Sequence, residues 1–243
     1  SYKYFYLDGY GKDFSVLNVK QTKISEQEFQ ESMFVANLLS FYEQLLVYEE
    51  NKHLAKEHNL EKPLWIFVGT TVVGKKNKKK NGEKLSKEEK KTVADVIQIV
   101  EFIKRVIKDE DWVKRWAKDI LEGRTKLKGE DDKDVFSGKF EYLKSKGVDF
   151  DELYRKVFGG RGSLQVYELK NAEGELGLKV SENEYFGVIN IGDVSGFKKQ
   201  LEKKGISVGQ DAISGSLFDN IKKENSPINI LIGSKKFIEG WDT

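Results

Sequence analysis

Six residues near the end of the sequence could contact phosphate and sugar groups. They follow residues 228–233, INILIG, a mostly apolar run that comes directly after Ser226-Pro227. Such a run predicts a strand that is buried on both faces and lies inside a sheet. In open α/β sheets, ligands bind beyond the carboxyl ends of the strands, where hydroxyl, ammonium, carboxylate and glycine groups could meet them. The candidates are Ser234, Lys235, Lys236, Glu239, Gly240 and Asp242. An ordinary solvated loop is the alternative, because serine, lysine and glycine are common in loops.

A second stretch with possible phosphate chemistry follows LWIFV. Gly69 to Lys76 comes within one residue of the phosphate-loop pattern G-x-x-x-x-G-K-[ST]. Lys76 stands where the magnesium-binding hydroxyl would be, and Val72 and Val73 are stiff β-branched residues in a loop that must wrap phosphates. We therefore expect no working phosphate loop. The lysine-rich run at 75–84 predicts a solvated loop, with phosphate contact as the alternative.

Other chemical patterns are weaker. Residues 159–163, GGRGS, lack phosphate-loop spacing and predict a flexible turn. Glu168-x-Lys170, downstream of Asp149 and Asp151, has the residue types of metal-dependent nucleases, but three-residue patterns recur by chance. The two histidines, His53 and His58, lie in a polar segment that predicts a solvated helix rather than a metal site.

Composition excludes several classes of protein. The 243 residues include 42 basic and 40 acidic ones, so the net charge of +2 neither favours nor excludes nucleic acid. Cysteine is absent, which excludes disulfides, thiolate metal sites and a cysteine nucleophile. No apolar run is long enough to span a bilayer and the first residues have no signal-peptide layout, so we expect a soluble, cytoplasmic protein.

Helical periodicity dominates the first two thirds of the chain. After an expected hairpin around Asp8-Gly9, a long helix is predicted from Ser25 to about Glu57, with Ser25 and Glu28 forming a capping box. The strand LWIFV follows, and then helices over 86–108, 109–121 and 150–157. A short helix is expected near residues 140–143, inside a charged stretch.

From residue 164 the pattern changes to alternating strands and helices. LQVYELK and LGLKV predict a hairpin, FGVIN a buried strand, and residues 194–204 a helix that Gly205 ends. A strand at 206–208 and a helix at 217–224 precede the apolar run at 228–233. This succession predicts an α/β fold with a parallel sheet and right-handed crossovers.

Several stretches resemble one protein family. PINILIGSKKFIEGWD is similar to motif V of superfamily 2 helicases, in the form found in the restriction (Res) subunit of type III restriction enzymes. LQVYELKNAEGELGL, FGVINIGD and SGSLFDNIKKENS add to the resemblance, which is strong from about Gly160 onward and looser from Tyr4 to Gly74. KPLWIFVGT is similar to motif IV, although the strand at 188–191 competes for that role. No similarity to this family is recognised between Lys75 and Gly159.

The resemblance implies that the chain forms the second lobe of a helicase, built on a RecA-like sheet of the P-loop NTPase type. It implies a hairpin and long helix at 1–62 that lead into the lobe at 63–243, with a helical insertion at about 75–160. Glu239, Gly240 and Asp242 would face the ATP cleft, and Ser234, Lys235 and Lys236 a DNA phosphate. Gly69 and Thr70 would contact a second phosphate. Trp241 could stack on a base, but a place in the lobe core is favoured.

The expected function is therefore part of an ATP-dependent DNA helicase or translocase of a type III restriction-modification system. Such motors use ATP and Mg²⁺ between two lobes, and the phosphate loop, the acidic pair and motif VI are not found in this sequence. We expect a fragment that does not hydrolyse ATP alone. Its expected partners are DNA, the first RecA-like lobe and a methyltransferase (modification) subunit. The alternatives are a non-enzymatic DNA-binding or scaffolding module and a self-contained nucleotide-binding enzyme that uses Gly69 to Lys76.

Overall fold

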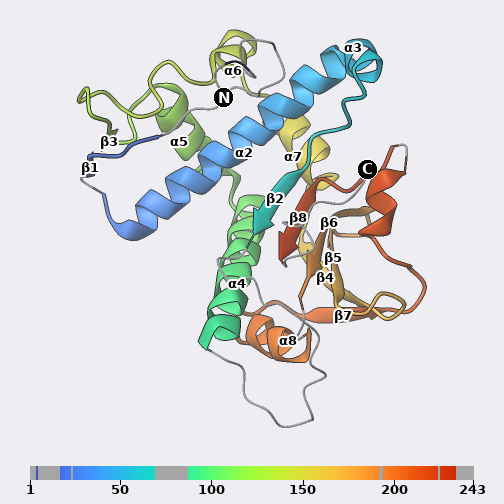
Figure 1. Ribbon diagram of the computed structural model, residues 1–243. Helices are drawn as coiled ribbons and strands as arrows, with labels where there is room; N and C mark the ends of the chain where they lie inside the picture. The colour runs from blue at the N-terminus through green and yellow to red at the C-terminus, as the bar shows by residue number, and fades with distance from the viewer. Residues whose placement is uncertain are drawn as a thin grey trace.

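The chain folds as helices packed on a six-stranded sheet (Figure 1). The computed structural model describes residue 4 and residues 17–22, 24–68, 87–191, 194–223 and 225–233. Its helices are α2 (Glu26–Glu50), α3 (Lys52–Glu57), α4 (Lys87–Lys108), α5 (Glu110–Leu121), α6 (Glu141–Lys146), α7 (Phe150–Phe158) and α8 (Val194–Lys203), with a 3-10 turn η1 (Asp219–Lys222). Its strands are β1 (Gln21–Thr22), β2 (Trp65–Val68), β3 (Leu127–Lys128), β4 (Leu164–Leu169), β5 (Glu175–Val180), β6 (Tyr185–Asn190), β7 (Val208–Asp211) and β8 (Ile230–Gly233).

The sheet has the order β2-β8-β6-β5-β4-β7. Every neighbouring pair is parallel except β4–β5 and β5–β6, so β5 alone runs against the other five strands. The α/β prediction is confirmed, but the sheet is mixed rather than parallel throughout. The reason is the two short links on either side of β5, because a parallel connection needs a crossover of a dozen or more residues.

Strand β8 lies inside the sheet, as the apolar run predicted. It pairs in parallel with β2 on one side and β6 on the other. All four of its residues are buried. The two strands that competed for the motif IV role are therefore both direct neighbours of β8.

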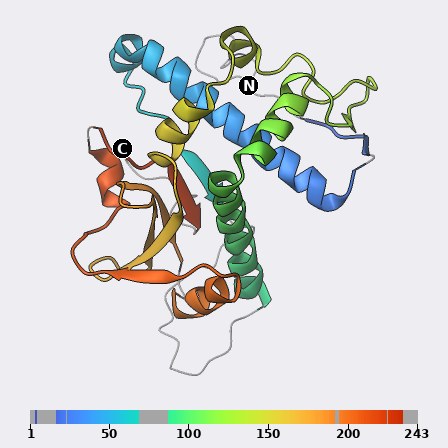
Figure 2. The same ribbon diagram turned by 180° about the vertical axis from the view of Figure 1, so that it is seen from behind.

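The two faces of the sheet are covered differently. Along β2, Trp65 and Phe67 point into a large core that also takes buried residues from α2, α4, α5, α7 and α8. Helix α4 lies against the sheet and contacts both β8 and β4 (Figures 1 and 2). The opposite face packs mainly against the irregular segment around Leu217 and Ile228. Ile66 and Val68, on that face, are 39% and 42% exposed.

Helix boundaries follow the expected local signals, with one interruption. Ser25 and Glu28 form the predicted capping box at the start of α2. Gly159, in a left-handed conformation with φ 76°, ends α7 as expected. The long helix is broken at Asn51, whose side chain donates to the carbonyl of Val47 and competes with the helical backbone.

Two local predictions were wrong, and one strand pairing was missed. The helix expected at 217–224 is only the turn η1, because the backbone N–H groups of Leu217 and Phe218 donate to the carboxylate of Glu175. The strand expected at 206–208 occupies Val208–Asp211 instead. The small β1–β3 pairing was not predicted, since two-residue strands carry no periodicity. The hairpin expected around Asp8-Gly9 lies outside the described residues, and the divisions at 62/63 and 75–160 stay predictions.

Candidate functional site

The carboxyl ends of β2 and β8 meet at one edge of the sheet. Val68, the last residue of β2, stands opposite Gly233, the last residue of β8. On the other side of β8, Gly233 stands opposite Asn190, the last residue of β6. Three parallel strands thus end in register, which is where ligands bind in open α/β sheets.

The predicted site residues themselves lie outside the described residues. They are Gly69, Thr70, Ser234, Lys235, Lys236, Glu239, Gly240 and Asp242. The near-phosphate-loop at 69–76 and the lysine run at 75–84 lie outside as well. The structure does place the residues that directly precede both predicted DNA-contacting segments, and these are neighbours on adjacent strands.

Gly233 is required by the backbone at this edge. Its φ is +129°, and a Cβ built on it would overlap the backbone carbonyl of Asn190. A side chain is thus excluded both by the backbone conformation and by the close approach of β6. The glycine of ILIG therefore sets how the chain leaves β8.

The nuclease-like residues do not form a metal site. Both oxygens of Glu168 meet lysines, Lys170 at 2.9 Å and Lys198 at 2.7 Å. The hydrogen bond from Lys198, and then that from Lys170, lowers the pKa of Glu168. Asp149 instead caps α7 and Asp151 pairs with Arg161. Across the described ranges, no group of three or more His, Asp or Glu side chains is placed to hold a metal ion.

A cleft of about 510 Å³ opens at the opposite end of the parallel strands, where β2, β6 and β8 begin. Its walls are the end of α2, the end of α7, the turn between β5 and β6, and the residues that lead into β8. Phe186 and Asn229 line it and are buried, while Glu182, Asn183 and Glu184 of the turn are exposed. This volume is in the range of small-molecule pockets, roughly 300 to 1,000 Å³.

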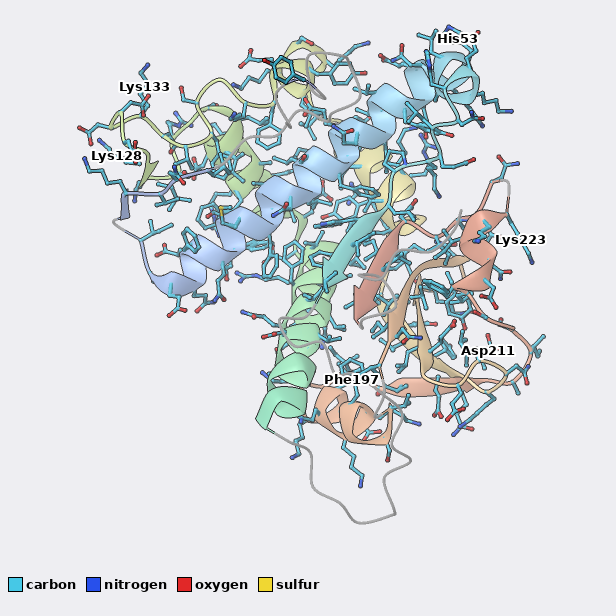
Figure 3. All side chains as sticks on the ribbon, in the orientation of Figure 1. His53, Lys128, Lys133, Phe197, Asp211 and Lys223 are labelled. Atoms are coloured by element: carbon cyan, nitrogen blue, oxygen red, sulfur yellow. The ribbon has the colours of Figure 1, made fainter. Side chains whose placement is uncertain are left out.

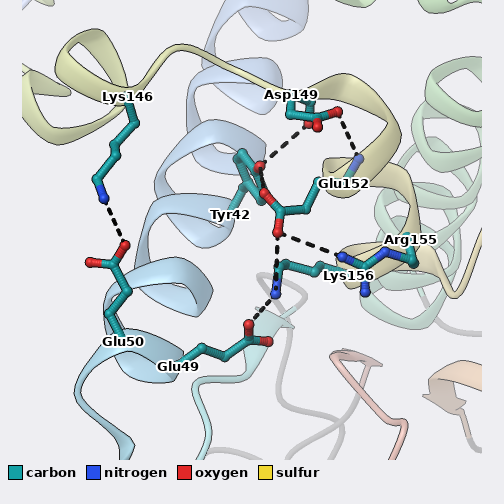
Figure 4. Close-up of polar contacts among 8 residues, drawn as sticks. All are labelled: Tyr42, Glu49, Glu50, Lys146, Asp149, Glu152, Arg155 and Lys156. Carbon is teal, nitrogen blue, oxygen red and sulfur yellow. Dashed lines mark hydrogen bonds and ion pairs between the residues drawn. The ribbon is translucent and has the colours of Figure 1, made fainter.

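One wall of the cleft is an ion-pair network between α2 and α7 (Figure 4). The Lys156 ammonium, only 10% exposed, pairs with Glu49 and lies 3.6 Å from Glu152. The Tyr42 hydroxyl donates to Glu152 over 3.0 Å, and burial followed by this bond raises the pKa of Tyr42. Arg155 lies 3.6 Å from the same carboxylate and is 67% exposed. The network thus neutralises Lys156 and joins the two helices.

Lys62 also lines the cleft, and its charge is only partly compensated. Its ammonium donates to the backbone carbonyl of Ser226, a neutral acceptor. No ion pair joins it to any carboxylate in the part of the chain that the structure describes. Burial lowers the pKa of Lys62 to about 8, against a smaller raising effect of Glu49.

Asn229 is a buried polar residue directly before β8, inside a run whose pattern predicts an apolar strand. Its side-chain amide donates to the carbonyls of Lys156 and Val157, at 2.8 and 2.9 Å, in the last turn of α7. It therefore caps a helix from a different part of the chain. A lone polar residue in the run INILIG was the available signal, because buried amides need hydrogen-bond partners.

Comparisons with known proteins identify no relative: no family model, no curated protein and no solved structure matches the chain. In the described ranges, none of the helices is both long and apolar enough to cross a membrane.

Proposed function

We propose that this chain acts as the second RecA-like lobe of an ATP-dependent DNA helicase or translocase of the type III restriction kind. The observation that carries the proposal is the position of β8, an inner strand that is parallel to both neighbours and ends in register with β2. The residues that follow these two strands are the ones whose sequence resembles motifs V and IV.

In this proposal the two segments act on DNA together. Ser234, Lys235 and Lys236 contact one backbone phosphate, and Gly69 and Thr70 contact the next. Lysine suits this role as a point charge, and glycine lets a phosphate approach the backbone closely. Such contacts hold DNA without reading its sequence.

The ATP cleft is shared with a first lobe. Glu239, Gly240 and Asp242 form this chain's side of it, while the first lobe supplies the phosphate loop and the carboxylates that hold Mg²⁺. The incomplete pattern at Gly69 to Lys76 is consistent with this division of labour. The chain alone then binds DNA but does not hydrolyse ATP, and a methyltransferase subunit is a further partner.

The test uses a full-length protein that contains this lobe. Lys235→Ala should lower DNA-stimulated ATPase activity about tenfold or more, because one phosphate contact of the moving lobe is lost. Lys133→Ala is the matched control, since Lys133 lies in the loop after β3, away from β8 (Figure 3), and should leave the rate unchanged. Equal rates for wild type and Lys235→Ala would reject the assigned role.

A non-enzymatic DNA-binding module is the second candidate. It is favoured by the missing hydroxyl at Lys76, which leaves this chain without a phosphate loop of its own. It predicts the same salt-dependent DNA binding, with no effect of ATP on DNA affinity in any longer form of the protein. A change in DNA affinity on nucleotide binding would support the helicase or translocase over the non-enzymatic module.

A further inference from the structure

The cleft where β2, β6 and β8 begin belongs to neither predicted contact surface. It lies at the opposite end of the strands from Val68 and Gly233. Its charges divide into two sets. Lys156 is neutralised by Glu49 and Glu152, and Glu182 of the mouth lies 3.4 Å from Lys179. Lys62, in contrast, donates to the carbonyl of Ser226 and has no ion pair among the described residues, since Glu49, the carboxylate that raises its pKa, is paired with Lys156.

A half-buried cation whose charge is only partly compensated is costly to keep charged unless a further anion pairs with it. The ammonium of Lys62 is held at the cleft wall by its hydrogen bond to the carbonyl of Ser226. An oxyanion entering the cleft would supply the missing charge. Arg155, 67% exposed and lining the same cleft, is a second cation within the site.

The mouth restricts what can enter. Glu49 and Glu182 at this opening pair with Lys156 and Lys179, and Glu184 is exposed beside them, so the charges largely cancel and offer a long polyanion such as DNA no attractive surface. A small molecule with a single anionic group passes these largely compensated carboxylates at a low electrostatic cost. The volume of about 510 Å³ accommodates such a molecule.

We propose that this cleft is a binding site for a small ligand that carries one phosphate or carboxylate group, with Lys62 as the charge partner of that group. The proposal is independent of the motor function, because it uses the other edge of the sheet and none of the predicted DNA-contacting or ATP-cleft residues. It makes the cleft a candidate regulatory site, because α2, α7 and β8 all border it.

Isothermal titration of the whole chain with inorganic phosphate, acetate and a short duplex DNA tests the proposal. Phosphate or acetate should bind the wild type, and whichever binds more tightly identifies the anionic group. Lys62→Met, which keeps most of the apolar stem, should weaken that binding about tenfold or more, the loss expected for one charge-assisted hydrogen bond. Lys170→Met is the control, because Lys170 pairs with Glu168 away from the cleft and should change nothing.

Two outcomes would overturn the proposal. One is the absence of phosphate and acetate binding to the wild type, and the other is unchanged binding by Lys62→Met. If Lys62→Met does not fold, the titration of Lys62 in the wild type is followed by NMR instead. The anion that binds should raise the pKa of Lys62, and a pKa unchanged by either anion rejects the site. DNA that competes with phosphate for Lys62 would also reject it, because duplex DNA is too wide to enter a cleft of about 510 Å³.

Discussion

Gly233 determines how the chain leaves β8 toward the predicted DNA-contacting residues. Its backbone conformation disfavours any side chain, and β6 occupies the space that a Cβ would need. Gly233→Ala should therefore lower the free energy of unfolding by roughly 2 to 4 kcal/mol, combining backbone strain with overpacking. Urea denaturation measures this. Gly215→Ala is the control, because Gly215 has no positive φ and open space around it, and it should cost less than about 0.5 kcal/mol.

Asp211, at the end of β7, makes the stability depend on pH (Figure 3). Its carboxylate accepts from the backbone and hydroxyl of Ser214, from the backbone of Ile213 and from Tyr185. These bonds, led by the Ser214 backbone, hold the pKa of Asp211 well below its usual range. The stabilisation is fully present above the unfolded pKa, about 3.9, and is lost as the pH falls through the lower folded pKa.

Asp211→Asn should accordingly destabilise the protein at pH 7, by about 1 kcal/mol once solvent screening is considered. The difference from wild type should shrink as the pH falls below about 4, because the wild-type carboxylate is then progressively protonated. Urea denaturation at several pH values measures both effects. Asp219→Asn, an exposed neighbour on η1, should show a smaller loss. A difference for Asp211→Asn that is independent of pH would contradict the assignment.

Two asparagines from separate segments of the chain donate to carbonyls at the end of α7. Asn229 donates from the start of β8 and is buried, while Asn183 donates to Gly159 from the exposed β5–β6 turn. Removing a buried amide leaves helix carbonyls without donors, so Asn229→Ala should cost about 1 to 3 kcal/mol. Asn183→Ala should cost under about 1 kcal/mol, because water can replace the exposed amide. Amide hydrogen exchange in the last turn of α7 should speed up more in the first variant, and equal effects would argue against a capping role for Asn229.

Sequence periodicity predicted most elements but not their arrangement. The apolar faces of α4, α5, α7 and α8 and the β4–β5 hairpin are local signals, and the structure contains these elements close to the expected limits. The strand order could not be predicted from local patterns. The place of β8 between β2 and β6 has no local signal, because any buried strand satisfies the same apolar pattern. The helix expected at 217–224 failed for a related reason, since Glu175, 42 residues earlier, takes the N–H of Leu217.

The two strands that precede the predicted site could be predicted, whereas the site residues themselves lie outside the described residues. The run INILIG and the strand LWIFV indicated two strands whose carboxyl ends should meet ligands, and these ends are adjacent. The cleft around Lys62 could not be predicted. It is formed by α2, α7, a β-turn and the lead into β8, which come together only in the folded chain.

For the molecule as a whole, one large core joins the helices to the sheet. Trp65 of β2 and Trp112 of α5 belong to the same cluster of buried residues. We therefore expect one cooperative unfolding transition, with tryptophan fluorescence and far-UV circular dichroism changing together. Separate transitions would instead support independent units, divided at residues 62/63 or around a helical insertion at 75–160.

The place of β8 also has a consequence for the newly made chain. Among the described strands, β2 pairs with β8 alone, although β8 is synthesised after every other strand of the described sheet. At about 5 to 20 residues per second, β2 waits roughly ten to thirty seconds on the ribosome for its partner. During that time Trp65 and Phe67 can be shielded only by helices, and the open side of β6 is exposed to other chains. A requirement for chaperones during translation, greater than for the completed protein, is the expected result.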